Sequence, residues 1–131
     1  MEILHQQLSD KLIELAIEVQ KELGVGFLER VYENSLVVAL QDETISVDQQ
    51  KHLNVYFRGR NVGIYVADLV VDDKIIVEIK AVESLSKAHY AQAINYLQAT
   101  DVEVAYVINF GKIPLQFKRL VKPNKQKPVA S

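Results

Sequence analysis

The sequence predicts an α/β fold in which a mixed sheet of four to five strands is flanked by helices. Two observations predict it. Apolar residues recur at helical spacing near the start of the chain and again over about 86–99, whereas the runs between them are rich in β-branched residues, as strands are. A helix between two strands permits a right-handed crossover and therefore a parallel strand pair. We expect the 131 residues to form one domain over 1–121, followed by a basic, flexible tail over 122–131.

Two helices are predicted at the start of the chain. Residues 8–23 carry apolar side chains at helical spacing, and Gly24 and Gly26 follow them. The second helix is predicted from about 27 to 40. Glu29 falls in its first turn, where the helix dipole favours a carboxylate, so a purely structural role for Glu29 is one alternative. The apolar stripe predicted for this helix comprises Leu28, Val31, Tyr32, Ser35, Leu36 and Ala39.

Strand character begins at Ile45, and a polar patch over 48–52 interrupts it. Ser86 is the predicted cap of a helix that ends near Gln98 or Ala99. The run 102–110 is almost wholly apolar, which is typical of a strand in the middle of a sheet covered on both faces. We expect a first strand over about 45–57, whose ends 45–47 and 53–57 alternate, and further strands over 62–71, 74–80, 102–110 and, at the edge, 115–121.

Composition and charge limit the functions that the chain can have. The net charge of −2 argues against a protein that coats nucleic acid generally. Acids predominate over residues 1–43 and bases over 104–131, which could form either a local phosphate-binding surface or an ordinary solvated one. The chain has no cysteine, which excludes disulfides and thiolate metal sites and fits the cytoplasmic location that we expect. We see no signal peptide and no apolar run long enough to span a membrane.

Three charged residues interrupt the apolar strands on either side of the Asp72-Asp73 turn: Asp68, Glu78 and Lys80. Burying an unpaired charge is costly, so such residues usually have a partner or a metal. Strand alternation puts Glu78 and Lys80 on one face, opposite the apolar residues of the same strand. A two-residue turn would place Asp68 on the face opposite to Glu78 and Lys80. We therefore predict an odd-length loop or a β-bulge between Asp68 and Glu78.

This spacing suits a metal site. Carboxylates bind hard divalent cations through oxygen, and a neighbouring ammonium can orient a water and stabilise negative charge at phosphorus. On the following helix, His89, Gln92 and Tyr96 fall at i, i+3 and i+7 and share one face. That face could line a substrate groove, or it could be an ordinary solvated surface.

Four motifs together resemble the PD-(D/E)xK nuclease superfamily, and specifically its GxxExxY branch. They cover roughly residues 8–121 in the expected order, with Ala67 in place of the usual proline. The four are Gly26–Tyr32 for Gly-x-x-Glu-x-x-Tyr, Ala67-Asp68 for Pro-Asp, Glu78–Lys80 for Glu-x-Lys, and Gln92–Tyr96 for Gln-x-x-x-Tyr.

The resemblance implies a restriction-endonuclease-like αβββαβ core and metal-dependent hydrolysis of phosphodiester bonds in DNA, with RNA as the alternative. It implies that Mg²⁺ or Mn²⁺ is held by Asp68, Glu78, the main-chain carbonyl of Ile79 and Glu29. Lys80 would activate or position the attacking water. The substrate contacts that we expect from the third helix are Gln92, Tyr96 and His89.

Two other functions stay open at this point. The modest charge favours a catalytically inactive module that binds nucleic acid or protein on the same scaffold, and a homodimer or a partner protein could complete so small a domain. Alternatively, Asp68, Glu78 and Lys80 form a buried structural ion network. No membrane partner is expected.

Overall fold

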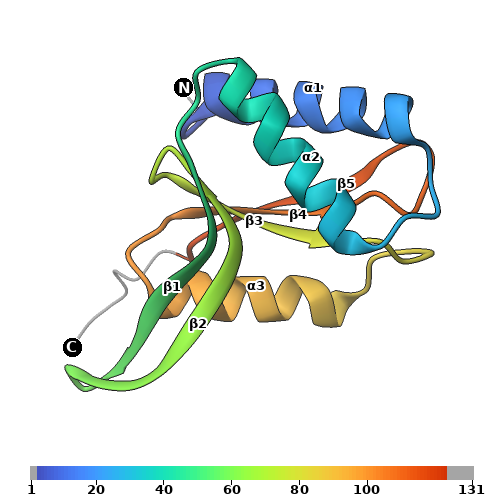
Figure 1. Cartoon of the computed structure of the whole chain (residues 1–131). Coiled ribbons are helices and arrows are strands. Elements are labelled where there is room, and N and C mark those ends of the chain that lie inside the picture. The colour runs from blue at the N-terminus through green and yellow to red at the C-terminus, as the bar shows by residue number, and fades with distance from the viewer. Residues whose placement is uncertain (1–2, 124–131) are drawn as a thin grey trace.

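The computed structural model describes residues 3–123 as a five-stranded mixed sheet with three helices (Figure 1). The strand order is β1-β2-β3-β4-β5, and β3 and β4 are parallel while all other neighbours are antiparallel. The predicted fold class is confirmed. The elements are α1 (Gln6–Leu23), α2 (Glu29–Asp42), β1 (Val47–Phe57), β2 (Arg60–Val71), β3 (Ile75–Lys80), α3 (Lys87–Ala99), β4 (Val104–Asn109) and β5 (Gln116–Val121).

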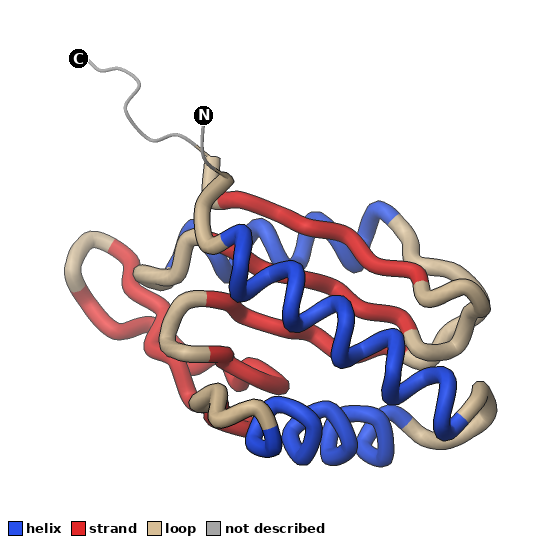
Figure 2. Tube along the Cα trace, turned by 90° about the horizontal axis from the view of Figure 1, so that it is seen from above, coloured by secondary structure: helices blue, strands red, loops and turns tan. Residues whose placement is uncertain are grey.

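Helices cover both faces of the sheet: α1 and α2 pack on one face and α3 packs on the other (Figure 1). Viewed from above, one helix crosses in front of the strands and another lies behind them (Figure 2). Each face has its own core, and Val77 and Ile76 are examples from the two sides of β3. Every residue of β4 is buried, as predicted for a central strand. None of the helices within residues 3–123 is long and apolar enough to cross a membrane.

The polar patch at 48–52 lies inside β1, which is one continuous strand paired with β2. Its side chains stay accessible because β1 is an edge strand, so they carry no apolar pattern for the periodicity to detect. The predicted tail lies largely outside the described residues.

The buried face of α2 is also rotated from the predicted one. Leu28 is 80% exposed and Val31 is 37% exposed, whereas Leu36 and Leu40 are fully buried. Tyr32 fixes the rotation, because its hydroxyl donates to the Gly24 carbonyl at 2.6 Å and its ring stacks on Phe110. This rotation turns Glu33 toward the sheet, where it is only 3% exposed.

Both strands of the β1–β2 hairpin change faces at the same level. In β2, Tyr65 and Ala67 pack on the α3 side, whereas Leu69 and Val71 pack on the α1/α2 side. Since all four are odd-numbered, the alternation must restart between Ala67 and Leu69. We call this point the face switch. It is level with Gln50 of β1, which adopts a positive φ of 52°.

The loop between β2 and β3 has three residues, Asp72 to Lys74, because Val71 pairs with Ile75 and Leu69 with Val77. The predicted odd-length loop is confirmed. The register places Asp68 level with Glu78, at the point where the β2–β3 ladder ends.

Candidate functional site

Asp68 and Glu78 lie together where β2 separates from β3. Beyond Leu69 and Val77 the main chains no longer pair, and side chains take over the hydrogen bonding. The Asp68 carboxylate accepts from the Ile79 N–H at 2.8 Å, and the Glu78 carboxylate accepts from the Asp68 N–H at 3.4 Å. Each carboxylate is therefore fixed by the other strand's main chain, which holds the two acids side by side.

Glu78 is also held by aromatic residues on the α3 side of the sheet. The Tyr65 hydroxyl donates to the Glu78 carboxylate, and the Tyr65 ring stacks on Tyr96 of α3 with 3.4 Å between ring centroids. Burial, with a further contribution from the Asp68 charge, raises the pKa of Glu78 to about 7. Burial and the Glu78 charge raise the pKa of Tyr65, so its hydroxyl stays protonated and remains a donor.

Glu33 is a site residue that the sequence reasoning missed. The Gln50 amide donates to both Glu33 carboxylate oxygens, at 3.0 and 3.2 Å, and to the Asp68 carboxylate at 3.3 Å. Gln49 donates to the same Glu33 carboxylate at 2.6 Å. Two consecutive strand residues reach one carboxylate because the positive φ of Gln50 interrupts the normal alternation.

A sequence signal for Glu33 did exist. It lies three and seven residues before Leu36 and Leu40, which places a charged residue on the buried stripe of α2. Its charge matters for the site: burial raises the pKa of Asp68, and repulsion from Glu33 adds to that shift, while the Ile79 N–H opposes it.

A cavity of about 560 Å³ opens beside these acids on the α2 side. Glu29 lies at its exposed rim, one helical turn from Glu33, and Arg30 lies 3.7 Å from the Glu33 carboxylate. The cavity thus collects three carboxylates around one space, although the proposed metal-binding role of Glu29 stays a prediction. The lining residues are Phe27, Leu28, Glu29, Arg30, Glu33, Gln50, Asp68 and Ala81.

Lys80 is half-buried, and its positive charge lowers the pKa values of Asp68 and Glu78, which places it near both acids. Within residues 3–123, no hydrogen bond or ion pair involves its ammonium group. The ammonium is therefore not held by a structural contact in the described part of the chain, unlike the carboxylates of Asp68 and Glu78.

The three predicted α3 residues differ in their connection to the site. Tyr96 reaches Glu78 through Tyr65, and Gln92 donates to the Tyr96 hydroxyl at 3.2 Å. His89 instead caps its own helix, because its Nδ1 accepts from the Ser86 N–H at 3.0 Å. The predicted substrate contacts of all three remain predictions.

The donor chemistry fits a hard divalent cation, since carboxylate oxygens are its preferred ligands. Across residues 3–123, no three His, Cys, Asp or Glu side chains are placed together as a ready-made metal centre. Mg²⁺ is commonly held by one or two carboxylates and completes its shell with water and substrate phosphate. Asp68 and Glu78 can supply such a pair. Their pKa values are raised mainly by burial and further by neighbouring negative charge, and a bound cation would favour the charged form of both acids.

The chain is similar to known proteins in sequence and in fold. Residues 6–120 match the family model described as the PD-(D/E)XK nuclease superfamily. No curated protein matches the chain. Among solved structures, the crystal structure of SSO0001 is similar, with a TM-score of 0.54 and 16% sequence identity. The similarity covers 92% of this chain and 61% of that one, so this chain spans about three fifths of its length. At that identity the likeness concerns the fold alone.

Proposed function

Because the chain belongs to the PD-(D/E)XK nuclease superfamily, we propose that it is a nuclease that uses Mg²⁺ or Mn²⁺ to hydrolyse phosphodiester bonds in DNA, with RNA as the alternative substrate. One observation carries the proposal. Asp68 and Glu78 meet at the point where β2 leaves β3, with the charge of Lys80 acting on both. Membership of the GxxExxY branch, for which Gly26–Tyr32 is the motif, is part of the proposal.

Each side chain has a proposed task. Asp68, Glu78 and the Ile79 carbonyl would hold the cation, and a carboxylate of α2, either Glu29 or Glu33, would complete its shell. When bound, the cation would polarise a phosphoryl oxygen and lower the pKa of water. Lys80 would orient the attacking water and donate to the negative charge that develops at phosphorus. Tyr65 keeps Glu78 in place, and Gln92 and Tyr96 would act on substrate from the α3 side.

Cleavage assays on linear, nicked, branched and single-stranded DNA, each with Mg²⁺ and with Mn²⁺, test the proposal. Lys80→Ala should lower cleavage by roughly 10²-fold or more, as the loss of a proton-handling or charge-stabilising group does. Lys74→Ala is the matched control, because Lys74 lies in the β2–β3 loop and pairs with Asp72 at 3.1 Å. No cleavage of any substrate by the folded wild-type protein would refute the nuclease function.

A second function has one observation in its favour. The Glu78 carboxylate is already occupied by Tyr65 and the Asp68 N–H, as in a scaffold that has lost its metal. Under this alternative the protein binds nucleic acid or another protein without catalysis. Titration calorimetry separates the two functions, since a folded protein that takes up neither Mg²⁺ nor Mn²⁺ would favour the inactive module.

A further inference from the structure

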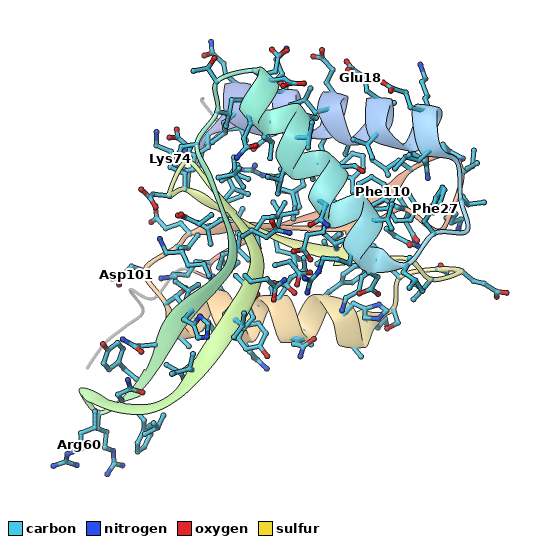
Figure 3. The ribbon with its side chains drawn as sticks, in the orientation of Figure 1. Glu18, Phe27, Arg60, Lys74, Asp101 and Phe110 are labelled. Atoms are coloured by element: carbon cyan, nitrogen blue, oxygen red, sulfur yellow. The ribbon has the colours of Figure 1, made fainter. Side chains whose placement is uncertain are left out.

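Residues 51–66 form a hairpin arm that extends beyond the helices, with Arg60 at its tip (Figures 1 and 3). No acidic residue occurs between 49 and 67. Lys51, at the base, is neutralised by Asp48 and Asp73. Neither Arg58 nor Arg60 forms an ion pair with any residue of the described range 3–123. The tip therefore carries two uncompensated positive charges.

The arm has one covered face and one open face. Leu53, Val55 and Tyr65 pack toward α3, whereas the opposite side chains face solvent. On the open face Tyr56 is 55% exposed and Ile64 is 60% exposed. The open face also carries polar groups in a row: the amide of Asn61 donates to Asn54, and the amide of Asn54 donates to Tyr56.

The tip adds an aromatic platform. Phe57 is 59% exposed, and the Arg58 guanidinium lies 4.9 Å from the centroid of its ring. Exposed aromatic rings next to arginines are the combination that stacks on bases and contacts phosphates in nucleic-acid-binding proteins. Neither the exposed ring nor the arginines contribute to the packing of the hairpin.

The open face of the arm continues into the candidate site. Ile64, Val66 and Asp68 alternate along β2 and therefore share one face, on the near side of the face switch. Asp68 and Gly59 are nine residues apart in sequence. A strand of that length spans roughly 30 Å at ~3.3 Å per residue, which equals about nine nucleotides at ~3.4 Å each.

We propose that the open face of the hairpin arm is the surface that holds the substrate's nucleic-acid strand, with Tyr56 against its bases and with Arg58 and Arg60 of the tip on its phosphates. The inference rests on the proposed function and names the surface that serves it. Charge argues for this occupant. Two bases near the end of the described chain are used internally, since Arg119 of β5 donates to the Leu4 carbonyl and Lys122, which follows β5, donates to the Thr100 carbonyl.

A second copy of the chain is the competing occupant, because exposed apolar strands also pair with themselves. Two arms meeting tip to tip would bring four arginines together without a counter-charge. The arm is thus better matched to a polyanion than to another arm.

The experiment measures the binding of fluorescent single-stranded DNA in EDTA, so that cleavage is not needed for a signal. Oligonucleotides of about 20 and 3 nucleotides are compared, because even a fully extended trinucleotide cannot contact Asp68 and the tip at once. Arg58→Glu/Arg60→Glu should weaken binding of the long oligonucleotide at least tenfold and flatten its salt dependence, and the trinucleotide should bind the wild type far more weakly than the long oligonucleotide does. Lys21→Glu/Lys74→Glu makes the same charge change away from the arm and should bind like the wild type once the lower net charge is allowed for.

A second variant tests stacking separately from charge. Tyr56→Ala should weaken binding of the long oligonucleotide severalfold without a change in salt dependence. Unchanged affinity in the arginine double variant would overturn the inference. So would arm variants that bind DNA normally but reduce self-association in light scattering, since the occupant would then be a second copy.

The outcomes for the arm and for catalysis are distinguishable. Arm-dependent DNA binding by a wild-type protein that never cleaves would leave the inference standing and refute the proposed nuclease. If the arm variants cleave and bind DNA normally, the nuclease function is supported and the proposed role of the arm in holding the strand is refuted.

Discussion

At the scale of single residues, the site is a set of acids held closer together than their charges favour. Asp68 and Glu78 are fixed by main-chain N–H groups, and Gln50 bridges Asp68 to the buried Glu33. The pKa values of Asp68 and Glu78 are raised mainly by burial. In their charged form these acids therefore lower the free energy of unfolding when no cation is present, and this effect can be measured.

The pKa of Glu78 gives a pH dependence of stability. Burial raises this pKa to about 7, above its ordinary value of 4.5, so the folded state binds more protons than the unfolded state between these values. Stability in metal-free buffer should therefore fall as pH rises from about 4.5 to about 7 and stay lower above it. Glu78→Gln should remove most of this fall and stabilise the protein at pH 8 by on the order of 1–3 kcal/mol.

Urea unfolding in EDTA at pH 5 and pH 8 checks this prediction. A loss of roughly 3–5 kcal/mol in Glu78→Gln at pH 8 would instead indicate the buried structural ion network, because breaking such a network leaves an uncompensated charge.

Two carboxylates of α2, those of Glu29 and Glu33, are candidates for acting with Asp68 on the cation. Glu29 lies at the exposed rim of the cavity, whereas Glu33 is buried and connected to Asp68 through Gln50. We expect Glu33→Gln to lower cleavage roughly 10- to 100-fold, as the loss of a group that orients a metal ligand does, and Glu29→Gln to lower it less. Initial rates at saturating Mn²⁺ decide the order. The reverse order would assign the direct role to Glu29.

At the scale of elements, the sequence carried enough information to predict the β2–β3 hairpin. The alternation in Ile75–Lys80 and the need to bring Asp68 level with Glu78 required an odd loop, and the loop has three residues. The rotation of α2 was not predictable, because it depends on the stacking of Tyr32 on Phe110, a residue distant in sequence. Glu33 was missed because the predicted apolar stripe did not include it, although its spacing from Leu36 and Leu40 was a signal.

The loop after β4 gives an element-scale prediction. A Cβ added to Gly111 would lie 2.5 Å from the Val82 carbonyl oxygen and 2.6 Å from its nitrogen, both main-chain atoms that cannot swing away. Gly111→Ala should therefore destabilise the fold by roughly 1–3 kcal/mol, as overpacking does. Gly63→Ala is the matched control, since a Cβ there meets nothing within 4 Å. Thermal unfolding of the two variants should differ clearly. Equal midpoints would show that the segments after β3 and β4 can separate.

At the scale of the whole molecule, the order of the elements and the mixed sheet were predictable from periodicity alone. The almost wholly apolar run 102–110 indicated a central strand, and the position of α3 between β3 and β4 indicated the crossover that makes these two strands parallel. The face switch was not predictable. It depends on a positive φ at Gln50, a residue type that gives no such signal.

Metal binding should be visible as a property of the whole fold. If the cation binds the folded chain alone, a concentration one hundred times Kd stabilises it by about 2.7 kcal/mol. Thermal unfolding should therefore shift upward with Mg²⁺ or Mn²⁺ and return on addition of EDTA. Glu78→Ala should abolish the shift. A shift that persists in this variant would place the bound cation elsewhere on the protein.

The face switch has a consequence for how this protein can change over evolution. Because both strands restart their alternation at Gln50 and Asp68, the part of the hairpin beyond that level is a separate module. Two residues inserted into each strand there would lengthen the module and leave every side chain facing as before. One residue inserted into each strand would move every side chain beyond that level to the opposite face. Related proteins should therefore vary in hairpin length by steps of two residues per strand, with the acids left untouched.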